Sequence, residues 1–345
     1  TSDLQYEIAL QGLTGGGYWA TWVSNLQDGS GYGNYAQRFD ADGAKIGAEF
    51  RLNATTSNHQ YCPSLTQLAD GSVMAFWASV PQDGNAYGLV GRRFSADGVA
   101  LSGEFQVNTY VTGNQTWPSA TSLQDGGFFV AWQSQNQDGS GYGAFGQRFN
   151  ADGSKAGSEI QINAYTSGDQ LNPRPATLAN GNIVVTWMSM GQDVASTYGS
   201  YARIYAASGN ALTGEIQVNV GTAGTQYYPV ATGLLDGSFI ISWYDSDAAP
   251  APGTGGDITA RRFAADGTAM TDEFRVNLAN VVNNQYKPTI AALSDGGFVV
   301  AWYTYSGSAF NAIMAQRFAA DGTAGESYTV ATQAYMNTAD QTPSI

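Results

Sequence analysis

Four loops of this chain repeat the same combination of an amide, a carboxylate and a phenol ring. Each reads as a variant of QDGSGYG, with a Tyr four or five residues after the Asp. Amide and carboxylate groups can hydrogen-bond the hydroxyls of a sugar, and a tyrosine ring can stack on a pyranose face. A plain turn is the alternative, although it needs only Asp-Gly and neither the Gln nor the Tyr. The candidate ligand-binding residues in these loops are Gln27, Asp28, Tyr32, Gln82, Asp83, Tyr87, Gln137, Asp138, Tyr142, Gln192, Asp193 and Tyr198.

A second set of candidates is aromatic and lies one or two residues after a recurrent Gln. A regular scaffold does not require exposed rings at this position, so we add them to the predicted ligand site. Packing around the mouth of a central channel is the alternative interpretation. These residues are Tyr61, Trp117, Tyr228 and Tyr286.

The remaining side chains give little support for catalysis. The chain has one histidine, His59, and one cysteine, Cys62, whose equivalents in the next repeat are Asn114 and Trp117. This excludes repeated histidine chemistry, a histidine-rich metal site and an internal disulfide framework. A carboxylate pair can act without histidine, and the divergent fifth loop, at 245–257, holds three aspartates. We nevertheless expect no catalytic residue and no enzyme.

The Ala-Asp-Gly turns resemble the opening of a calcium-binding loop. Only the copy at 39–43, FDADG, has two carboxylates. Calcium needs six to eight oxygen ligands, and no bidentate Glu follows at the right distance. We therefore expect no cofactor and leave calcium binding by the QDG loops open.

The elements that position these residues repeat about every 55 residues. The tryptophans that mark the repeat are Trp22, Trp77, Trp132, Trp187, Trp243 and Trp302. A fixed period of this size indicates a repeat architecture, and six units fill the chain without a break in composition. We predict one domain over residues 1–345, with units at about 1–54, 55–109, 110–164, 165–220, 221–278 and 279–345.

Each unit reads as four short strands. Gln-x-x-Pro opens the first strand in five copies, an Asp-Gly or Asn-Gly turn follows, and the second strand is a continuous apolar run such as FFVAW at 128–132. The third strand ends at Arg-Phe or its variant, and an Ala-Asp-Gly turn leads to a fourth strand such as EFQVN at 104–108. Hairpin turns and a strand apolar on both faces are typical of sheets packed face to face.

We therefore predict an all-β fold, a six-bladed β-propeller of four-stranded antiparallel blades. A β-solenoid is the alternative, but its coils are shorter. The loops between second and third strands and the crossovers between units share one face, where we place the function. The chain ends, at 341–345, on the beginning of another first strand. This segment either completes the first unit or indicates a longer array.

Two recurrent features of the repeat are interpreted as structural. The tryptophans end the apolar strands and are expected to pack between blades. The Arg of the third strand and the Glu of the fourth, such as Arg93 and Glu104, are expected to form a cross-strand ion pair. Gripping a ligand carboxylate or sugar hydroxyls is the alternative for the Arg.

Charge and composition limit the partners. The formal net charge is −14 with 28 acidic and 14 basic residues, which argues against nucleic acid and anionic membrane. No run of 18 apolar residues is present, so no membrane insertion is expected. An acidic, lysine-poor, disulfide-free composition is typical of a secreted or surface-exposed bacterial protein.

The combination of DGGFVVAW at 295–302 with QDGSGYG and QRF-x-ADG resembles a repeat of large secreted bacterial surface proteins of the RTX and cadherin-bearing type. The resemblance covers about residues 13–330 and implies export and an adhesin-like role. The GGxGxDxUx nonapeptides that bind calcium in such proteins do not occur in this chain, so that activity is not implied. Fungal six-bladed fucose lectins offer a looser likeness at the level of the fold.

Together these observations favour a secreted, non-catalytic, multivalent carbohydrate-binding protein whose partners are glycans or a cell-surface polysaccharide. The first alternative is a structural protein that assembles with other copies of itself at a cell surface or in a filament. The second is a polysaccharide-active enzyme that depends on carboxylates, for which one unit would have to differ chemically from the rest.

Overall fold

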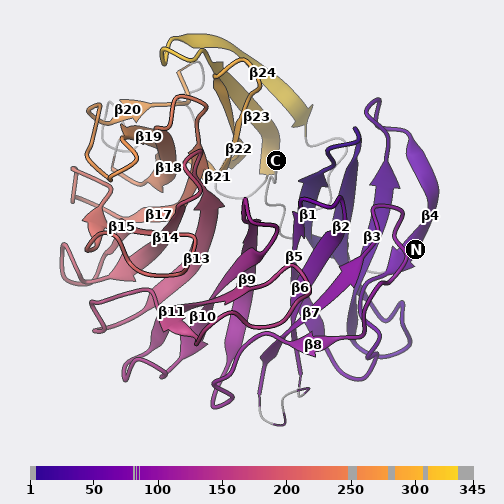
Figure 1. Cartoon of the computed structure of the whole chain (residues 1–345). Helices are drawn as coiled ribbons and strands as arrows, with labels where there is room; N and C mark the ends of the chain where they lie inside the picture. The colour runs from indigo at the N-terminus through magenta and orange to yellow at the C-terminus, as the bar shows by residue number, and fades with distance from the viewer. Residues whose placement is uncertain are drawn as a thin grey trace. The chain divides into compact units, whose positions relative to one another are not determined.

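The computed structural model describes residues 5–80, 82, 84, 86–247, 255–278, 284–305 and 310–332. They form six four-stranded antiparallel sheets, each made of four strands that are consecutive in the chain (Figure 1). These are the blades of a six-bladed β-propeller, which confirms the predicted fold class. The candidate Asp83 and the terminal segment 341–345 lie outside the described residues. Within the described ranges, no helix is long and apolar enough to cross a membrane.

The chain divides into two compact units of three blades each, whereas the single domain over residues 1–345 stays a prediction. Unit 1 holds blade 1 (β1 to β4), blade 2 (β5 to β8) and blade 3 (β9 to β12). Its strands are β1 (Gln5–Gly12), β2 (Tyr18–Asn25), β3 (Tyr32–Phe39), β4 (Lys45–Arg51), β5 (Gln60–Gln67), β6 (Val73–Ser79), β7 (Gly88–Phe94), β8 (Phe105–Gln106), β9 (Gln115–Ser122), β10 (Phe128–Gln135), β11 (Tyr142–Phe149) and β12 (Ile160–Gln161).

Unit 2 holds blade 4 (β13 to β16), blade 5 (β17 to β20) and blade 6 (β21 to β24). In each unit the first strands of neighbouring blades lie against each other. The strands of unit 2 are β13 (Gln170–Thr177), β14 (Ile183–Met190), β15 (Tyr198–Tyr205), β16 (Ile216–Gln217), β17 (Gln226–Gly233), β18 (Phe239–Asp245), β19 (Asp257–Phe263), β20 (Phe274–Arg275), β21 (Asn284–Ala292), β22 (Phe298–Tyr305), β23 (Phe310–Phe318) and β24 (Ala324–Thr332).

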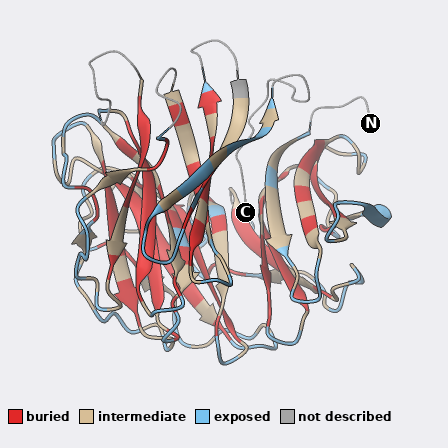
Figure 2. Ribbon diagram, turned by 90° about the horizontal axis from the view of Figure 1, so that it is seen from above, coloured by how far each residue is buried: buried red, intermediate tan, exposed pale blue. Residues whose placement is uncertain are grey.

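The core lies between blades, on both faces of the second strands. Burial is concentrated in the inner strands, whereas exposed residues lie at turns and loops and along the outer strands β4 and β24 (Figure 2). Trp132 of blade 3 packs with Met74 and Phe76 of blade 2. Burying a large apolar side chain in this way stabilises the fold by about 1.5–3 kcal/mol. Five of the six repeat tryptophans are fully buried, as expected of packing residues.

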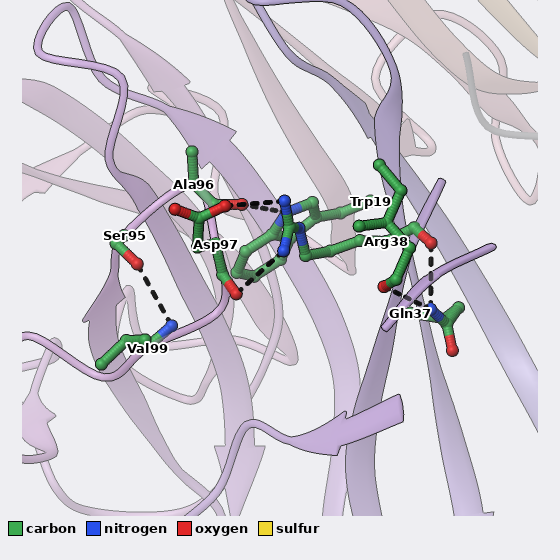
Figure 3. Close-up of polar contacts among 8 residues, drawn as sticks. Trp19, Gln37, Arg38, Ser95, Ala96, Asp97 and Val99 are labelled. Atoms are coloured by element: carbon green, nitrogen blue, oxygen red, sulfur yellow. Dashed lines mark hydrogen bonds and ion pairs between the residues drawn. The ribbon is translucent and has the colours of Figure 1, made fainter. Parts of the chain in front are cut away.

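Blade 1 departs from this pattern. Trp22 is only partly buried, and Trp19 is the fully buried tryptophan of the blade. Trp19 donates its Nε1 hydrogen bond to the backbone oxygen of Ala96 in blade 2 at 3.1 Å, as Figure 3 shows. The indole therefore joins two blades of unit 1 through both its apolar surface and its N–H.

Every first strand contains one residue with a left-handed backbone at the same position. The strand pairing shifts register there, as in a β-bulge. Proline follows in five of the six copies, where no ladder donor is needed. A positive φ in a non-glycine residue is uncommon and strained. The six residues, with φ between 46° and 56°, are Glu7, Cys62, Trp117, Asn172, Tyr228 and Lys287.

Candidate functional site

Two aspartates of the QDG loops, Asp28 and Asp193, bind a buried asparagine of their own blade. Asp28 Oδ2 accepts a hydrogen bond from Asn53 Nδ2 at 3.1 Å, and Asp193 Oδ2 accepts one from Asn219 Nδ2 at 3.1 Å. Asn53 Nδ2 also donates to Gln60 Oε1 at 3.1 Å. Because buried polar groups need hydrogen-bond partners, these aspartates have a structural task that needs no ligand.

The loop glutamines are likewise bound within the protein. Each donates from Nε2 to a glutamate of its own blade, which lies within β4 in blade 1 and directly before the short fourth strand in blades 2 to 4. In blades 2 to 4 that glutamate also accepts a backbone N–H from a crossover segment. Glu104, for example, accepts from Ala54 N at 2.5 Å and from the Thr55 hydroxyl at 2.7 Å. The pairs are Gln27 with Glu49 at 2.5 Å, Gln82 with Glu104 at 2.8 Å, Gln192 with Glu215 at 2.7 Å, and Gln137 with Glu159.

The expected ion pair between the third-strand Arg and the fourth-strand Glu is therefore wrong. In blade 5 Arg262 pairs with Asp236 of the first turn at 2.5 Å, and in blade 1 Arg38 reaches Asp97 of blade 2 at 2.7 Å (Figure 3). The fourth strand is only two residues long in blades 2 to 5, and in blade 2 it pairs with Val90 and Gly91 alone. Arg93 thus has no ladder partner in that strand, and its side chain turns to Asp70.

The structure does bring the loop tyrosines and the strand aromatics together in unit 1. The ring centroids of Tyr32 and Tyr61 lie 5.2 Å apart, those of Tyr61 and Tyr87 lie 5.5 Å apart, and His59 stacks on Tyr61 at 5.5 Å. Burial is the main cause that raises the pKa of the Tyr61 phenol, and a hydrogen bond with Tyr87 adds to it. Trp117 remains 43% exposed.

In unit 2 the corresponding aromatics form a second group. Tyr198 contacts Tyr227 at 5.4 Å between ring centroids, and Tyr228 contacts Tyr286 at 5.4 Å. Tyr286 also lies edge-on to Tyr244 at 4.5 Å. Tyr32, Tyr61 and Tyr87 therefore cluster in unit 1, and Tyr198, Tyr228 and Tyr286 each contact another ring in unit 2.

Blade 5 contains a cavity that the repeat pattern does not explain. Its volume is about 310 Å³. Asp245 ends β18 directly opposite Asp257 at the start of β19, where the pairs in blades 1 to 4 are a serine opposite a glycine. The side chains that line the cavity come from Gly221, Ala223, Asp245, Asp247, Thr259, Glu273, Phe274 and Arg275.

Two smaller residues open this space. Thr259 stands opposite Trp243, where blades 1 to 4 have Tyr, Val, Phe and Tyr. Gly221 comes two residues after Asn219, an asparagine that recurs in the repeat. At the position of Gly221, blades 1 to 3 have Thr or Tyr. The fifth loop also has no glutamine to bind Glu273. The cavity thus results from several departures from the repeat within one blade.

The two aspartates that face each other on β18 and β19 are buried. Asp245 is 5% exposed and Asp257 is 2% exposed. Burial raises the pKa of Asp245, hydrogen bonds from Asp247 N and Gln226 oppose the rise, and the charges of Glu273 and Asp247 add to it. The Asp245 carboxyl is therefore held toward its protonated form beside two other acids.

Arg275 is fixed by the second buried aspartate. Its guanidinium contacts Asp257 Oδ1 at 2.8 Å, and the same oxygen accepts from Asn277 Nδ2 at 2.7 Å. Burial nevertheless raises the pKa of Asp257, against the hydrogen bond from Asn277 and the charge of Arg275. Asp257 Oδ2 and Arg275 Nε are buried without a hydrogen-bond partner. Such unsatisfied groups are costly and are typical of a site that a ligand or water completes.

A second cavity, of about 370 Å³, lies between blades 2 and 3, with Arg93, Glu104 and Asp152 among its lining residues. Its charged residues follow the repeat, and Arg93 and Glu104 are already paired. Among the residues that the structure describes, no group of three or more His, Cys, Asp or Glu side chains is arranged to hold a metal ion. Calcium binding stays a prediction.

The repeat pattern of the sequence points to the QDG loops and only secondarily to the acidic fifth loop. That pattern alone does not reveal the pairing of Asp245 with Asp257, or the contribution of Glu273, Arg275 and Thr259 to the lining of the cavity. The signal was present, because a column-by-column comparison of the six repeats shows aspartate where four units have Ser and Gly. Strand pairing was needed to show that these columns face each other.

Comparisons with solved structures support the same fold. A protein of unknown function from Dyadobacter fermentans is 12% identical with a TM-score of 0.62, over 91% of this chain and 94% of that one. An α-L-arabinanase from Penicillium chrysogenum, in complex with arabinobiose, is 15% identical with a TM-score of 0.61, over 92% and 94%. A Hadza microbial sialidase is 13% identical with a TM-score of 0.55, over 87% of this chain and 63% of that protein.

No protein-family model and no curated protein matches the chain, so the resemblance to bacterial surface repeats stays a prediction. The expectation that the protein is not an enzyme is contradicted by the solved structures, because two of the three just described are glycoside hydrolases by name. It rested on the scarcity of histidine, and carboxylates alone can carry such chemistry. The non-catalytic interpretation is withdrawn.

Proposed function

We propose that this protein is a carbohydrate-active β-propeller that hydrolyses glycosidic bonds in the cavity of blade 5. The observation that carries the proposal is the buried Asp245, which replaces a serine of the repeat and lines the cavity together with Asp247 and Glu273. The likeness to propellers named as arabinanase and sialidase supports the choice of a glycan as substrate.

Two carboxylates with different protonation suffice for this reaction. Asp245, whose pKa is raised by burial, donates its proton to the glycosidic oxygen as the bond to the anomeric carbon breaks. Glu273, which accepts the Val220 N–H at 2.5 Å, takes a proton from the water that attacks that carbon. The products are two sugars, and one water is consumed. Exchange with solvent returns both carboxyls to their starting states.

Arg275 and Asp257 act as positioning residues. The ion pair at 2.8 Å holds the guanidinium at the wall of the cavity, where its remaining N–H groups can meet sugar hydroxyls or the charge of Glu273. A bidentate or multiple donor of this kind fixes the orientation of a substrate. Loss of Asp257 would release Arg275 and misplace it.

The test is release of reducing ends from a panel of neutral and acidic polysaccharides, with arabinan included. Asp245→Ser is the informative variant, since serine occupies this position in blades 1 to 4 and the fold should tolerate it. We expect turnover to fall at least about a hundredfold, the usual size of a general-acid contribution, and Glu273→Gln to act similarly.

Asp42→Ser, an exposed turn position in blade 1, is the matched control and should keep full activity. A wild-type protein that releases nothing from any member of the panel, or an Asp245→Ser variant as active as the wild type, would overturn the proposal.

A further inference from the structure

Arg174 is the one arginine of the chain whose side chain has no hydrogen-bond or ion-pair partner among the described residues. The other ten arginines, all within the described ranges, hold carboxylates, hydroxyls or backbone oxygens. Arg174 lies in β13 and is exposed to solvent. In a chain with a net charge of −14, an unpaired guanidinium is unexpected.

Packing does not explain Arg174 either. It follows the left-handed residue of its strand by two positions and pairs with Thr186 of β14. The residues at this position in the other blades are small or aliphatic, so the scaffold does not require a long cation here. They are Ala9, Ser64, Ser119, Val230 and Thr289.

The first strands of the next two blades supply complementary groups. Arg174 of β13 and Tyr228 of β17 stand on first strands that lie against each other, and Thr186, the ladder partner of Arg174, donates its hydroxyl hydrogen bond to Pro229 O, next to Tyr228, at 2.7 Å. Lys287 of β21 places Nζ 5.5 Å from the centre of the Tyr228 ring. The ring of Tyr286 lies 5.4 Å from that of Tyr228.

We propose that Arg174, Tyr228 and Lys287 form a binding site for the carboxylate of an acidic sugar, separate from the cavity of blade 5. The planar guanidinium matches a carboxylate with two parallel hydrogen bonds. Lys287 adds a second positive charge, and the Tyr228 and Tyr286 rings offer a surface on which the sugar ring can stack. The inference goes beyond the proposed function, because binding at this site does not require cleavage.

Affinity for a trigalacturonate is the measurement, by ligand-observed NMR or calorimetry, with a neutral galactose trisaccharide as the paired probe. Asp245→Ser serves as the background, so that hydrolysis cannot consume the ligand. We expect the acidic probe to bind more tightly than the neutral one. Adding Arg174→Ser should weaken that binding about tenfold or more. Serine already occupies the equivalent position in β5 and β9.

Lys45→Ser is the matched control, because it removes one positive charge at an exposed position of β4 and should leave affinity unchanged. Equal binding of the two trisaccharides, no binding of either, or equal losses in Arg174→Ser and Lys45→Ser would overturn the inference. Competition by inorganic phosphate as strong as by galacturonate would also overturn it, since it would show a general anion site. Binding of the trigalacturonate by a wild-type protein that also cleaves no member of the polysaccharide panel would contradict the proposed function and leave this inference standing.

Discussion

At the scale of single residues, the position of an acid in the repeat decides its role. Asp193 in blade 4 accepts a hydrogen bond from Asn219, whereas Asp245 in blade 5 borders a cavity and faces another acid. The first is satisfied by its own blade. The second is disfavoured in its charged form by burial and by its neighbours, which is how proteins adjust a carboxyl for proton transfer.

This difference predicts a pH dependence of stability for Asp245. The pKa of Asp245 is raised in the folded protein. The native state therefore binds more protons than the unfolded state over the pH interval from about 3.9, the ordinary pKa of aspartate, up to the raised value. Stability contributed by this group is therefore lost as pH rises through that interval. We expect Asp245→Ser to lose less stability than the wild type there, measured by urea unfolding.

The control is Asp42→Ser, which should follow the wild-type curve. Parallel curves for the wild type and Asp245→Ser across this interval would contradict the raised pKa. If Asp245 is the proton donor, hydrolysis should also decline as pH rises through the same raised value, because the acid form is lost.

At the scale of elements, crossovers between blades are tied to the neighbouring blade by the glutamate before each short fourth strand. Glu104 accepts hydrogen bonds from Ala54, Thr55 and Gln82. Burial works against its charge, but these hydrogen bonds outweigh burial and lower its pKa. The glutamate is thus a joint between blades 1 and 2 and also the reason for the Gln of the QDG loop.

We therefore expect Glu104→Ala to destabilise unit 1 by about 1–3 kcal/mol, the cost of leaving several polar groups without a partner. Amide exchange at Ala54 and Thr55 should accelerate, since both N–H groups lose their acceptor. Chemical unfolding together with hydrogen exchange measures both effects. Glu326→Ala, at an exposed position of β24, should change neither, and an equal effect of the two variants would remove the assigned role of Glu104.

At the scale of the whole molecule, the dominant feature is negative charge. With 28 acidic and 14 basic residues, the folded chain repels itself near neutral pH. Raising ionic strength from about 0.01 M to about 0.1 M shortens the Debye length from about 30 Å to about 10 Å and screens that repulsion. We expect the Tm to increase over this range at neutral pH. The increase in Tm should vanish near pH 4.2, the isoelectric point calculated from the sequence. A Tm that falls with salt at neutral pH would contradict the prediction and show that surface ion pairs outweigh the repulsion.

Much of the architecture follows from the sequence because its determinants are local and repeated. The period of the tryptophans, the Asp-Gly turns and the apolar second strands predict six four-stranded blades, and the structure confirms them. Turn chemistry and strand burial act over a few residues, so spacing along the chain carries them. The burial of Trp132 could be predicted from the sequence in the same way. That Trp19 and not Trp22 is the fully buried tryptophan of blade 1 could not.

Tertiary structure alone decided the partners of the polar side chains. Glu104 meets Ala54 and Arg38 meets Asp97 across 50 and 59 residues of chain, distances over which sequence spacing does not specify a contact. The same holds for the cavity of blade 5 and for Arg174 beside Tyr228, since each depends on which columns of the repeat face each other across strands. The repeat determined the scaffold, and the packing of blade on blade decided which of its deviations form a site.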